Sequence, residues 1–473
     1  MKHRTATTGV AALAALPLVP ADALGHTSEQ SFVLLLPTKL YISAGIMAVA
    51  LTVLILAVAP SFTSRRAFAT RRLLAIEPPV ELKTATSLVS LLLLGTLIGL
   101  GFFGSHDPLS NPLPLAIWTV WWMAMLFIQG VAGDIWGWIN PWTGLHRLLV
   151  RNGRDGFVPA LPDWACHSIA ITSLLAFHIF ALADPAPDDP KRLAGFVFAY
   201  WVFSFIGMLI FGRIVWFEKC ECFSVLFSLF ARLSPFRLSA GRFEFGLSGW
   251  QLVRMERVPT GMALFALIAL GTGSFDGLNE TFWWLALIGV NPLEFPGRSA
   301  VIAETVVGLL AAPILLVAVF GTCTWAGTLL AGSNGTAGKT SFGTAFRRLA
   351  VSVLPIALGY HFAHYLTAFM VNIQYAVATV SDPLHTGADY LGLGNFYVTT
   401  GFFNTRDSVR IIWLTQCFAV VAGHVLAVIA AHEIACRIFG TGRQAFLSQL
   451  PVSVFMILYT LLSLWLLASP RGA

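Results

Sequence analysis

The sequence of 473 residues has little charge. Asp, Glu, Lys and Arg together make up 11% of it, and hydrophobic residues make up 57%. A soluble domain usually carries about 25% charged residues, so this composition excludes an ordinary soluble globular protein. The basic residues are dispersed along the chain, which gives no reason to expect a nucleic-acid partner.

Cysteine is also scarce, with six residues in the whole chain. Cys220 and Cys222 are too close in sequence for a typical zinc-binding pair, and no second pair accompanies them. We therefore interpret the cysteines as mostly structural. The chain also lacks an internal repeat, a Ser-based catalytic triad pattern and a phosphate-cradling glycine loop.

Long apolar runs are what the sequence has in abundance. Several reach about 20 residues, the length that lets a helix cross a bilayer. We predict an all-α, polytopic membrane helix bundle with ten transmembrane helices. The predicted spans lie at roughly 38–58, 84–104, 113–133, 163–183, 193–212, 259–274, 299–321, 349–380, 410–435 and 446–468.

Residues 1–25 have the features of a signal peptide: basic residues first, then a short apolar core and a small-x-small cleavage site at 21–23. Residues 26–473 would then form a single transmembrane domain. Most of the 29 Lys and Arg fall in alternate loops, so the positive-inside rule predicts both termini outside after signal removal. Segment 213–258 would be cytoplasmic, with an amphipathic helix on the membrane surface, and 381–409 would be a long outer loop.

The eighth span contains polar side chains at depth, in the stretch YHFAHYLTAFMVNIQY at 360–375. Helical steps of about 100° place His361, His364, Tyr365 and Asn372 on one face. Exposure of that face to lipid would leave its donors and acceptors unpaired. We therefore expect it to face the bundle interior or a cavity.

Histidines from other spans reach a similar depth. His361 and His424 each lie 13 residues from an inner arginine, and His178 lies 15 residues from Asp163. A rise of about 1.5 Å per residue places all three near the middle of the membrane, and His432 lies two turns further in than His424. Imidazoles suit a divalent metal such as Zn, Cu or Fe. A haem, a proton relay or hydrogen bonds that only join helices remain alternatives.

A second polar group is expected toward the outside. Glycines at 271–277 suggest that the sixth span breaks there, with Asp276 beyond the break. Glu304 begins the seventh span. Either carboxylate can act as a base or an ion ligand, or else cap a turn or remain solvated.

Two further patterns indicate packing. A small residue recurs at every fourth position of the ninth span, from Ala419 through Gly423 to Ala435, which allows another helix to approach closely. Trp118, Trp121 and Trp122 either line a pocket or pack together, and packing is the favoured interpretation.

Several short motifs occur in an order that resembles the bacterial polytopic membrane proteins known as fenitrothion hydrolases. The resemblance covers about residues 100–435. The motifs are GSHDPLSNP at 104–112, GDIW at 133–136, NPW at 140–142, GSFDG at 273–277, AHYLT at 363–367, SDP at 381–383, GHV at 423–425 and AH at 431–432.

The resemblance implies hydrolysis of neutral aryl phosphotriesters or phosphorothioates, at the bacterial inner membrane. A metal held by His364 and His424, with His361, His178 or His432, would then supply hydroxide, and Asn372 would orient the water or the substrate. The partners would be the lipid bilayer and an apolar small molecule, and no partner subunit is identifiable. A transporter or proton-coupled carrier, and a haem or metal electron-transfer subunit, are the alternatives.

Overall fold

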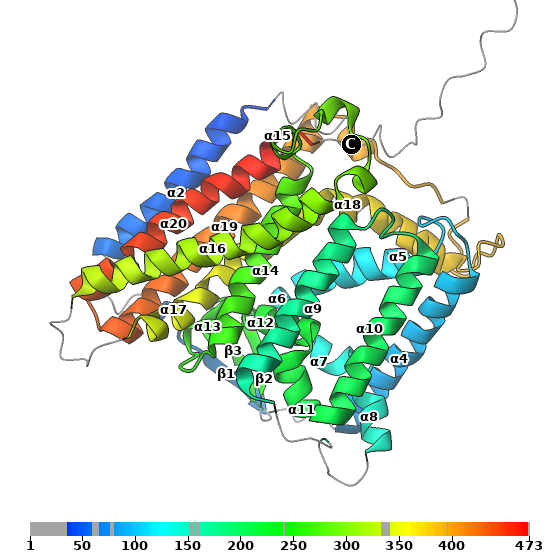
Figure 1. Ribbon diagram of the computed structural model, residues 1–473, viewed down its shortest axis with the longest axis horizontal. Helices are drawn as coiled ribbons and strands as arrows, with labels where there is room; N and C mark the ends of the chain where they lie inside the picture. Colours follow the sequence, from blue (N-terminus) through cyan, green and yellow to red (C-terminus); the bar gives the residue numbers. More distant parts are fainter. Residues whose placement is uncertain are drawn as a thin grey trace, which may run out of the picture.

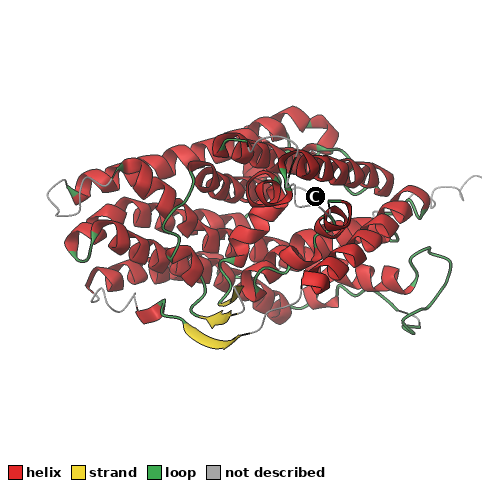
Figure 2. Ribbon diagram, turned by 90° about the horizontal axis from the view of Figure 1, so that it is seen from below, coloured by secondary structure: helices red, strands yellow, loops and turns green. Residues whose placement is uncertain are grey.

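The computed structural model describes residues 36–58, 66–75, 80–150, 156, 161–239, 242–332, 341–394 and 396–471. The predicted signal peptide at 1–25 lies outside these ranges. Within them, ten helices are long and apolar enough to cross a membrane, which confirms the predicted polytopic α-helical bundle (Figures 1 and 2). The outside location of the two termini stays a prediction.

All ten spans occur where the apolar runs predict them, and most boundaries shift by a few residues. Seven spans are single helices: α2 (Thr38–Val58), α4 (Val80–Phe103), α9 (Asp163–Ala183), α10 (Pro190–Phe211), α14 (Thr260–Asn279), α16 (Ile302–Ala331) and α20 (Arg443–Ala468). An eighth, α19 (Arg406–Phe439), is also unbroken. The other two are composite: α5 (Pro112–Pro114), the π-helix η1 (Leu115–Met125) and α6 (Leu126–Ala132), and α17 (Phe342–Ala350), η5 (Val351–Val353) and α18 (Leu354–Ser381).

Short elements connect the spans. They are α7 (Trp136–Ile139), α8 (Thr143–Leu149), α11 (Arg213–Val215), η2 (Trp216–Cys220), α12 (Cys222–Ala231), α13 (Trp250–Val253), α15 (Phe282–Leu287), η3 (Pro292–Glu294), η4 (Arg298–Ala300) and η6 (Gly401–Phe403). Three antiparallel strands, β1 (Arg71–Ala75), β2 (Phe236–Ser239) and β3 (Arg242–Phe245), form a small sheet of order β1-β3-β2. It lies at the edge of the bundle in Figure 2.

The spans pack as two groups of helices. In one group, α20 contacts α2, α16 and α19, and α2 also contacts α19; in the other group, α4 and α10 pair with each other. Figure 1 shows the two groups side by side. Helices α14 and α18 lie between them, because α14 contacts both α16 and α9 and α18 contacts both α19 and η1. Residues of α14 and α18 are therefore placed where the two groups meet.

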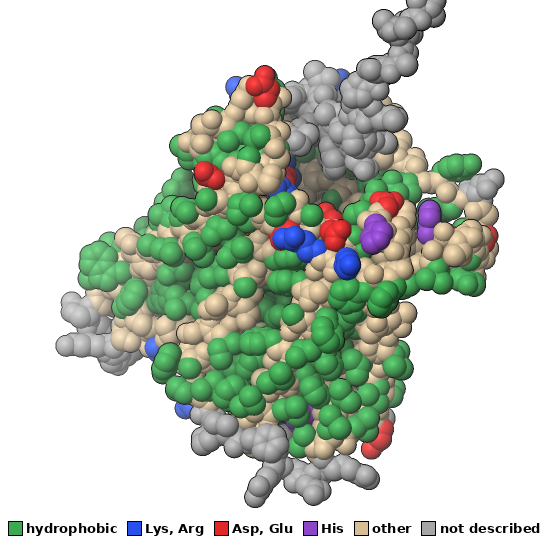
Figure 3. Space-filling model, turned by 45° about the vertical axis from the view of Figure 1, so that its right-hand side comes forward, with side chains coloured by type: hydrophobic (Ala, Val, Ile, Leu, Met, Phe, Trp, Pro, Cys, Tyr) green, Lys and Arg blue, Asp and Glu red, His purple; other side chains and the backbone are tan. Residues whose placement is uncertain are grey.

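The outer surface of the bundle is apolar. Side chains such as Val58, Leu92 and Phe103 are 85%, 72% and 91% exposed, as expected where a helix faces lipid rather than protein. In Figure 3, hydrophobic side chains cover most of the visible face, and a row of charged residues crosses its upper half.

Two expectations are wrong. The sixth span does not break at its glycines, since α14 continues through Asn279. Those glycines instead allow close packing, because a methyl group at Gly271 would lie 2.6 Å from the Cα of Pro313. The amphipathic segment does not lie on the membrane surface either, since nearly all of α12 is buried within the protein.

The loop between α18 and α19, predicted to lie outside, is organised by carboxylates. Asp389 accepts hydrogen bonds from the Leu393 and Gly394 amides at 2.7 and 2.9 Å and from the Ser381 hydroxyl at 2.9 Å. These bonds lower the pKa of Asp389, and the bond from the Gly394 amide has the largest effect. Gln374 also pairs with Thr399 in both directions, at 2.9 and 3.0 Å, which ties the loop to α18.

We expect Asp389→Asn to increase proteolytic cleavage within this loop at neutral pH. A lowered pKa means that the bonds stabilise the loop above the usual carboxyl pKa of about 4 and are lost as the pH falls through the lower folded value. Cleavage of the wild-type loop should therefore rise only in strong acid. Limited proteolysis across pH measures this. Asp407→Asn, an exposed neighbour in α19, is the matched control, and equal cleavage of the two variants would contradict the assignment.

Candidate functional site

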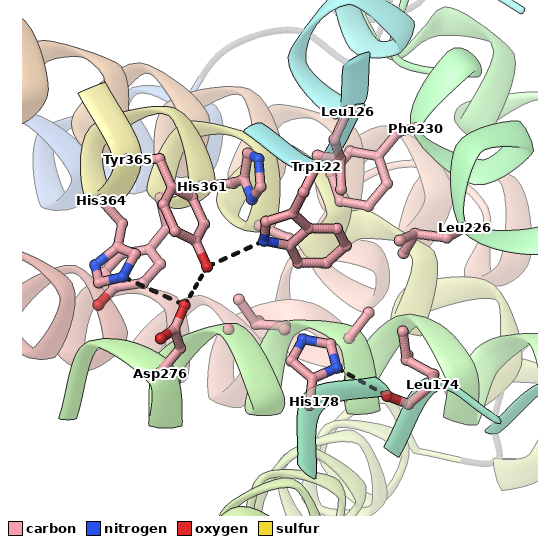
Figure 4. Close-up of a pocket in the computed structure, with 15 residues that line it drawn as sticks. Trp122, Leu126, Leu174, His178, Leu226, Phe230, Asp276, His361, His364 and Tyr365 are labelled. Carbon is pink, nitrogen blue, oxygen red and sulfur yellow. Dashed lines mark hydrogen bonds and ion pairs between the residues drawn. The ribbon is translucent and has the colours of Figure 1, made fainter. Parts of the chain in front are cut away.

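A small cavity lies at the boundary between the two helix groups (Figure 4). Its polar lining comes from four spans: Trp122 on η1, His178 on α9, Asp276 on α14, and His361, His364 and Tyr365 on α18. The remaining lining is mostly apolar. The cavity volume is about 40 Å³, which is enough for about three water molecules.

Asp276 is at the centre of a hydrogen-bonded network. Its Oδ2 accepts a bond from the Tyr365 hydroxyl at 2.5 Å, and that hydroxyl accepts from Trp122 Nε1 at 3.1 Å. His364 Nε2 lies 3.3 Å from the same carboxylate oxygen. Two donors on one oxygen fix the carboxylate in place, so its other oxygen can interact with a molecule in the cavity.

Arg471 sets the tautomer of His364. Its guanidinium lies 3.3 Å from His364 Nδ1, and because arginine can only donate, Nδ1 must accept. The ring proton is then on Nε2, where it faces Asp276. Arg471 itself is held beside the C-terminal end of α14, since Phe282 N donates to Pro470 O at 3.0 Å and Thr281 forms a β-bridge with Arg471.

His178 and His361 each leave one ring nitrogen available. His178 Nδ1 donates to the Leu174 carbonyl at 2.9 Å, and His361 Nε2 donates to the Met123 carbonyl at 3.2 Å. In a neutral imidazole the second nitrogen is then an acceptor. Both rings therefore carry a lone pair, on Nε2 of His178 and on Nδ1 of His361, held in position by the backbone.

Local backbone features position these groups. The π-helical hydrogen bonding of η1 offsets the ring of Trp122 relative to an ordinary α-helix, and such segments occur often at functional sites. On α14, Gly277 allows α18 to approach, because a methyl group there would lie 1.7 Å from the Tyr360 hydroxyl. That close contact brings His361 and His364 beside Asp276.

The other candidates from the sequence lie elsewhere. Asn372 is half-buried two turns further along α18 and Glu304 is exposed in the first turn of α16; neither lines the cavity. His424 is fully buried, donates Nδ1–H to Val420 O at 2.8 Å and faces Tyr459. His432 is bonded to Gln449 at 2.7 Å, near the inner end of α19.

The cavity residues do not form a metal site as they stand. Within the described ranges, no three His, Cys, Asp or Glu side chains lie close enough together to hold an ion. His178 and His361 nevertheless have the arrangement usual for metal-ligating histidines, with one N–H bonded to a carbonyl and the other nitrogen available. A resident Zn, Cu or Fe ion therefore stays a prediction.

We expect elemental analysis of the purified protein to detect such a divalent ion, and His361→Ala, which removes one of the two imidazoles with an available ring nitrogen, to remove it. The matched control is His432→Ala, because both ring nitrogens of His432 already contact Gln449 and Cys436. Absence of metal from the wild type, or equal metal in the two variants, would rule out the predicted site.

Three groups of the site, two that line the cavity and one that contacts His364, were not among the candidates from the sequence. Tyr365 shares the predicted polar face of 361–372 but is not a usual metal ligand, and Trp122 is interpreted as packing. Arg471 lies 107 residues beyond His364, in a segment with no motif. Only the four-residue spacing of His361 and Tyr365 could have indicated the tyrosine.

A second, apolar cavity adjoins the first. Its volume is about 250 Å³, and aromatic and aliphatic side chains of α4, η1, α9 and α10 line most of it. Phe177 lines this cavity, and its ring centroid lies 4.7 Å from that of Trp122, which lines the small one. Contact between these two rings separates the cavities.

The chain matches no protein-family model, no curated protein and no solved structure.

Proposed function

We propose that this protein is a membrane-embedded hydrolase of neutral, apolar phosphorus esters, with aryl phosphotriesters and phosphorothioates as the substrate class. It would act in a bacterial inner membrane, where such substrates dissolve. The main support for the proposal is that two cavities lie next to each other. The small cavity has room for a few water molecules and is lined by a carboxylate and three imidazoles, and the larger cavity is apolar. The motif resemblance supplies the chemical class.

The proposed reaction uses a water molecule in the small cavity. The Asp276 carboxylate takes a proton from that water while the water oxygen forms a bond to phosphorus. The bond between phosphorus and the aryloxy oxygen breaks, and the aryloxide leaves with the electron pair. A nitrophenolate is a good leaving group and needs little protonation. Tyr365 and His364 hold Asp276 in position.

The apolar surroundings of the small cavity also favour hydrolysis. Water confined to about three positions in an apolar environment interacts more strongly with a carboxylate than bulk water does, because the local dielectric constant is low. On α9, which packs against α14, His178 Nε2 is a second group that can accept a proton from the water. The site therefore has three proton acceptors, on Asp276, His178 and His361, and the one imidazole N–H that points into it is that of His364, which faces Asp276.

The direct test is turnover by the purified protein in lipid nanodiscs. Release of 4-nitrophenol from diethyl 4-nitrophenyl phosphate is measured by absorbance, with no ion gradient present. We expect release above the rate of empty nanodiscs. A rate equal to that of empty nanodiscs, for both the phosphate and its thiophosphate analogue, would overturn the proposal.

A proton-coupled carrier is the second candidate, favoured by one observation. His364 and Asp276, two groups that can each take up and release a proton, lie 3.3 Å apart inside the bundle, as a proton path requires. Reconstituted liposomes distinguish the two functions. A carrier would give gradient-dependent uptake without nitrophenol release, whereas a hydrolase would release nitrophenol without a gradient.

A further inference from the structure

The apolar cavity has a specific chemical character. It lies between α4, η1, α9 and α10 at the level of the aromatic cluster of η1. Rings from all sides contribute to its wall, among them Trp118, Trp121, Trp142, Phe180, Phe196 and Trp201. Such a wall offers flat faces and edges, against which another aromatic ring packs favourably.

The size of the cavity limits its occupant. A dry apolar cavity of about 150 Å³ accommodates benzene, and this one measures about 250 Å³. It therefore has room for a substituted benzene ring. The small cavity, at about 40 Å³, has room for water only. Neither cavity by itself holds a whole aryl triester, which must extend across both.

The partition between the cavities is one layer of rings thick. The Phe177 ring lies 4.7 Å from Trp122 and 5.3 Å from His178, centroid to centroid. A ring bound beside Phe177 is thus separated from the acceptor nitrogen of His178 by a single side chain. Rotation of Phe177 about its side-chain bonds would join the two spaces.

We propose that the apolar cavity is the binding site for the aromatic ring of a neutral substrate that reaches it from the bilayer. This inference rests on the proposed function for its reaction, but binding can be tested without turnover.

The test uses 4-nitroanisole, a neutral nitroaryl compound that cannot be hydrolysed at phosphorus. Nitroaryl groups quench tryptophan fluorescence, and five tryptophans line the cavity (Trp118, Trp121, Trp136, Trp142 and Trp201). We expect saturable quenching by the wild type in nanodiscs. Val197→Phe, which fills the cavity from α10, should weaken the apparent affinity at least tenfold.

The matched control is Val89→Phe, the same change at a position on α4 that is 65% exposed. It should bind as the wild type does. Ser90→Leu fills the cavity from the opposite wall and replaces Val197→Phe if that variant fails to fold. Both filling variants should also raise KM for an aryl triester more than they lower kcat.

Unchanged quenching in both filling variants would overturn the inference. Competition by an alkyl lipid such as oleate, with no preference for aromatic compounds, would also overturn it and indicate an acyl-chain site. Quenching that follows the expected pattern without any nitrophenol release would support the aromatic site and reject hydrolysis as the function.

Discussion

Asp276→Asn is expected to lower kcat/KM for an aryl phosphotriester by about 100- to 10,000-fold, the usual contribution of a general base. Asparagine keeps the shape of the side chain and can still accept the hydrogen bond that Tyr365 donates at 2.5 Å. It cannot take a proton from water, and it removes the negative charge beside His364. The measurement is nitrophenol release at several substrate concentrations.

The matched control for this variant is Glu294→Gln, which neutralises an exposed carboxylate of η3. We expect it to retain wild-type kinetics. Glu304→Gln tests the other carboxylate that the sequence analysis names as a candidate base. If it abolished turnover while Asp276→Asn remained active, the reaction would occur near Glu304 rather than in the small cavity. Equal elution profiles in detergent would show that each variant is folded.

The fold was predictable because a bilayer allows few backbone structures to cross it. A chain in lipid must satisfy its backbone hydrogen bonds within each segment, so each apolar run of about 20 residues forms a helix, and all ten did. The sheet was not predictable. Its strands β1 and β3 pair residues 71–75 with 242–245, and neither segment shows a strand pattern strong enough to predict pairing over that separation.

The site was predictable only along single helices. Helical spacing placed His361, His364 and Tyr365 on one face, and all three line the cavity. The estimated depth placed His424 at the same level, but depth along a helix does not determine which way a side chain points. His424 faces Tyr459 on α20 instead.

The location of Asp276 was predicted wrongly because the glycine pattern before it was misinterpreted. The glycines at 271–277 indicated a broken helix, which placed Asp276 in an outer group with Glu304. Because α14 continues to Asn279, its helical geometry brings Asp276 to the level of His364. These glycines instead allow close packing, since Pro313 of α16 and Tyr360 of α18 lie directly against them. Sequence alone does not distinguish a glycine that breaks a helix from one that packs.

The contact between α18 and α19 gives the second large expected effect, in the variant Gly423→Ala. A methyl group at Gly423 would lie 2.5 Å from the carbonyl oxygen of Pro355, and one at Gly359 would lie 2.4 Å from that of Ala419. The small-residue pattern of the ninth span predicted such an approach, and these distances confirm it. Backbone atoms cannot move aside as a flexible side chain can, so we expect a destabilisation of about 1–3 kcal/mol.

The control for this change is Gly95→Ala on α4, where an added methyl group meets nothing within 4 Å. Alanine is favoured over glycine inside a helix by about 0.5–1 kcal/mol, so the two variants should shift the apparent Tm in opposite directions. Thermal unfolding in detergent measures both. Gly423→Ala should also reduce turnover, because α18 carries His361 and His364 and would be pushed away from α19. An unchanged or raised Tm for Gly423→Ala would mean that the two helices separate at little cost and do not hold the cavity in shape.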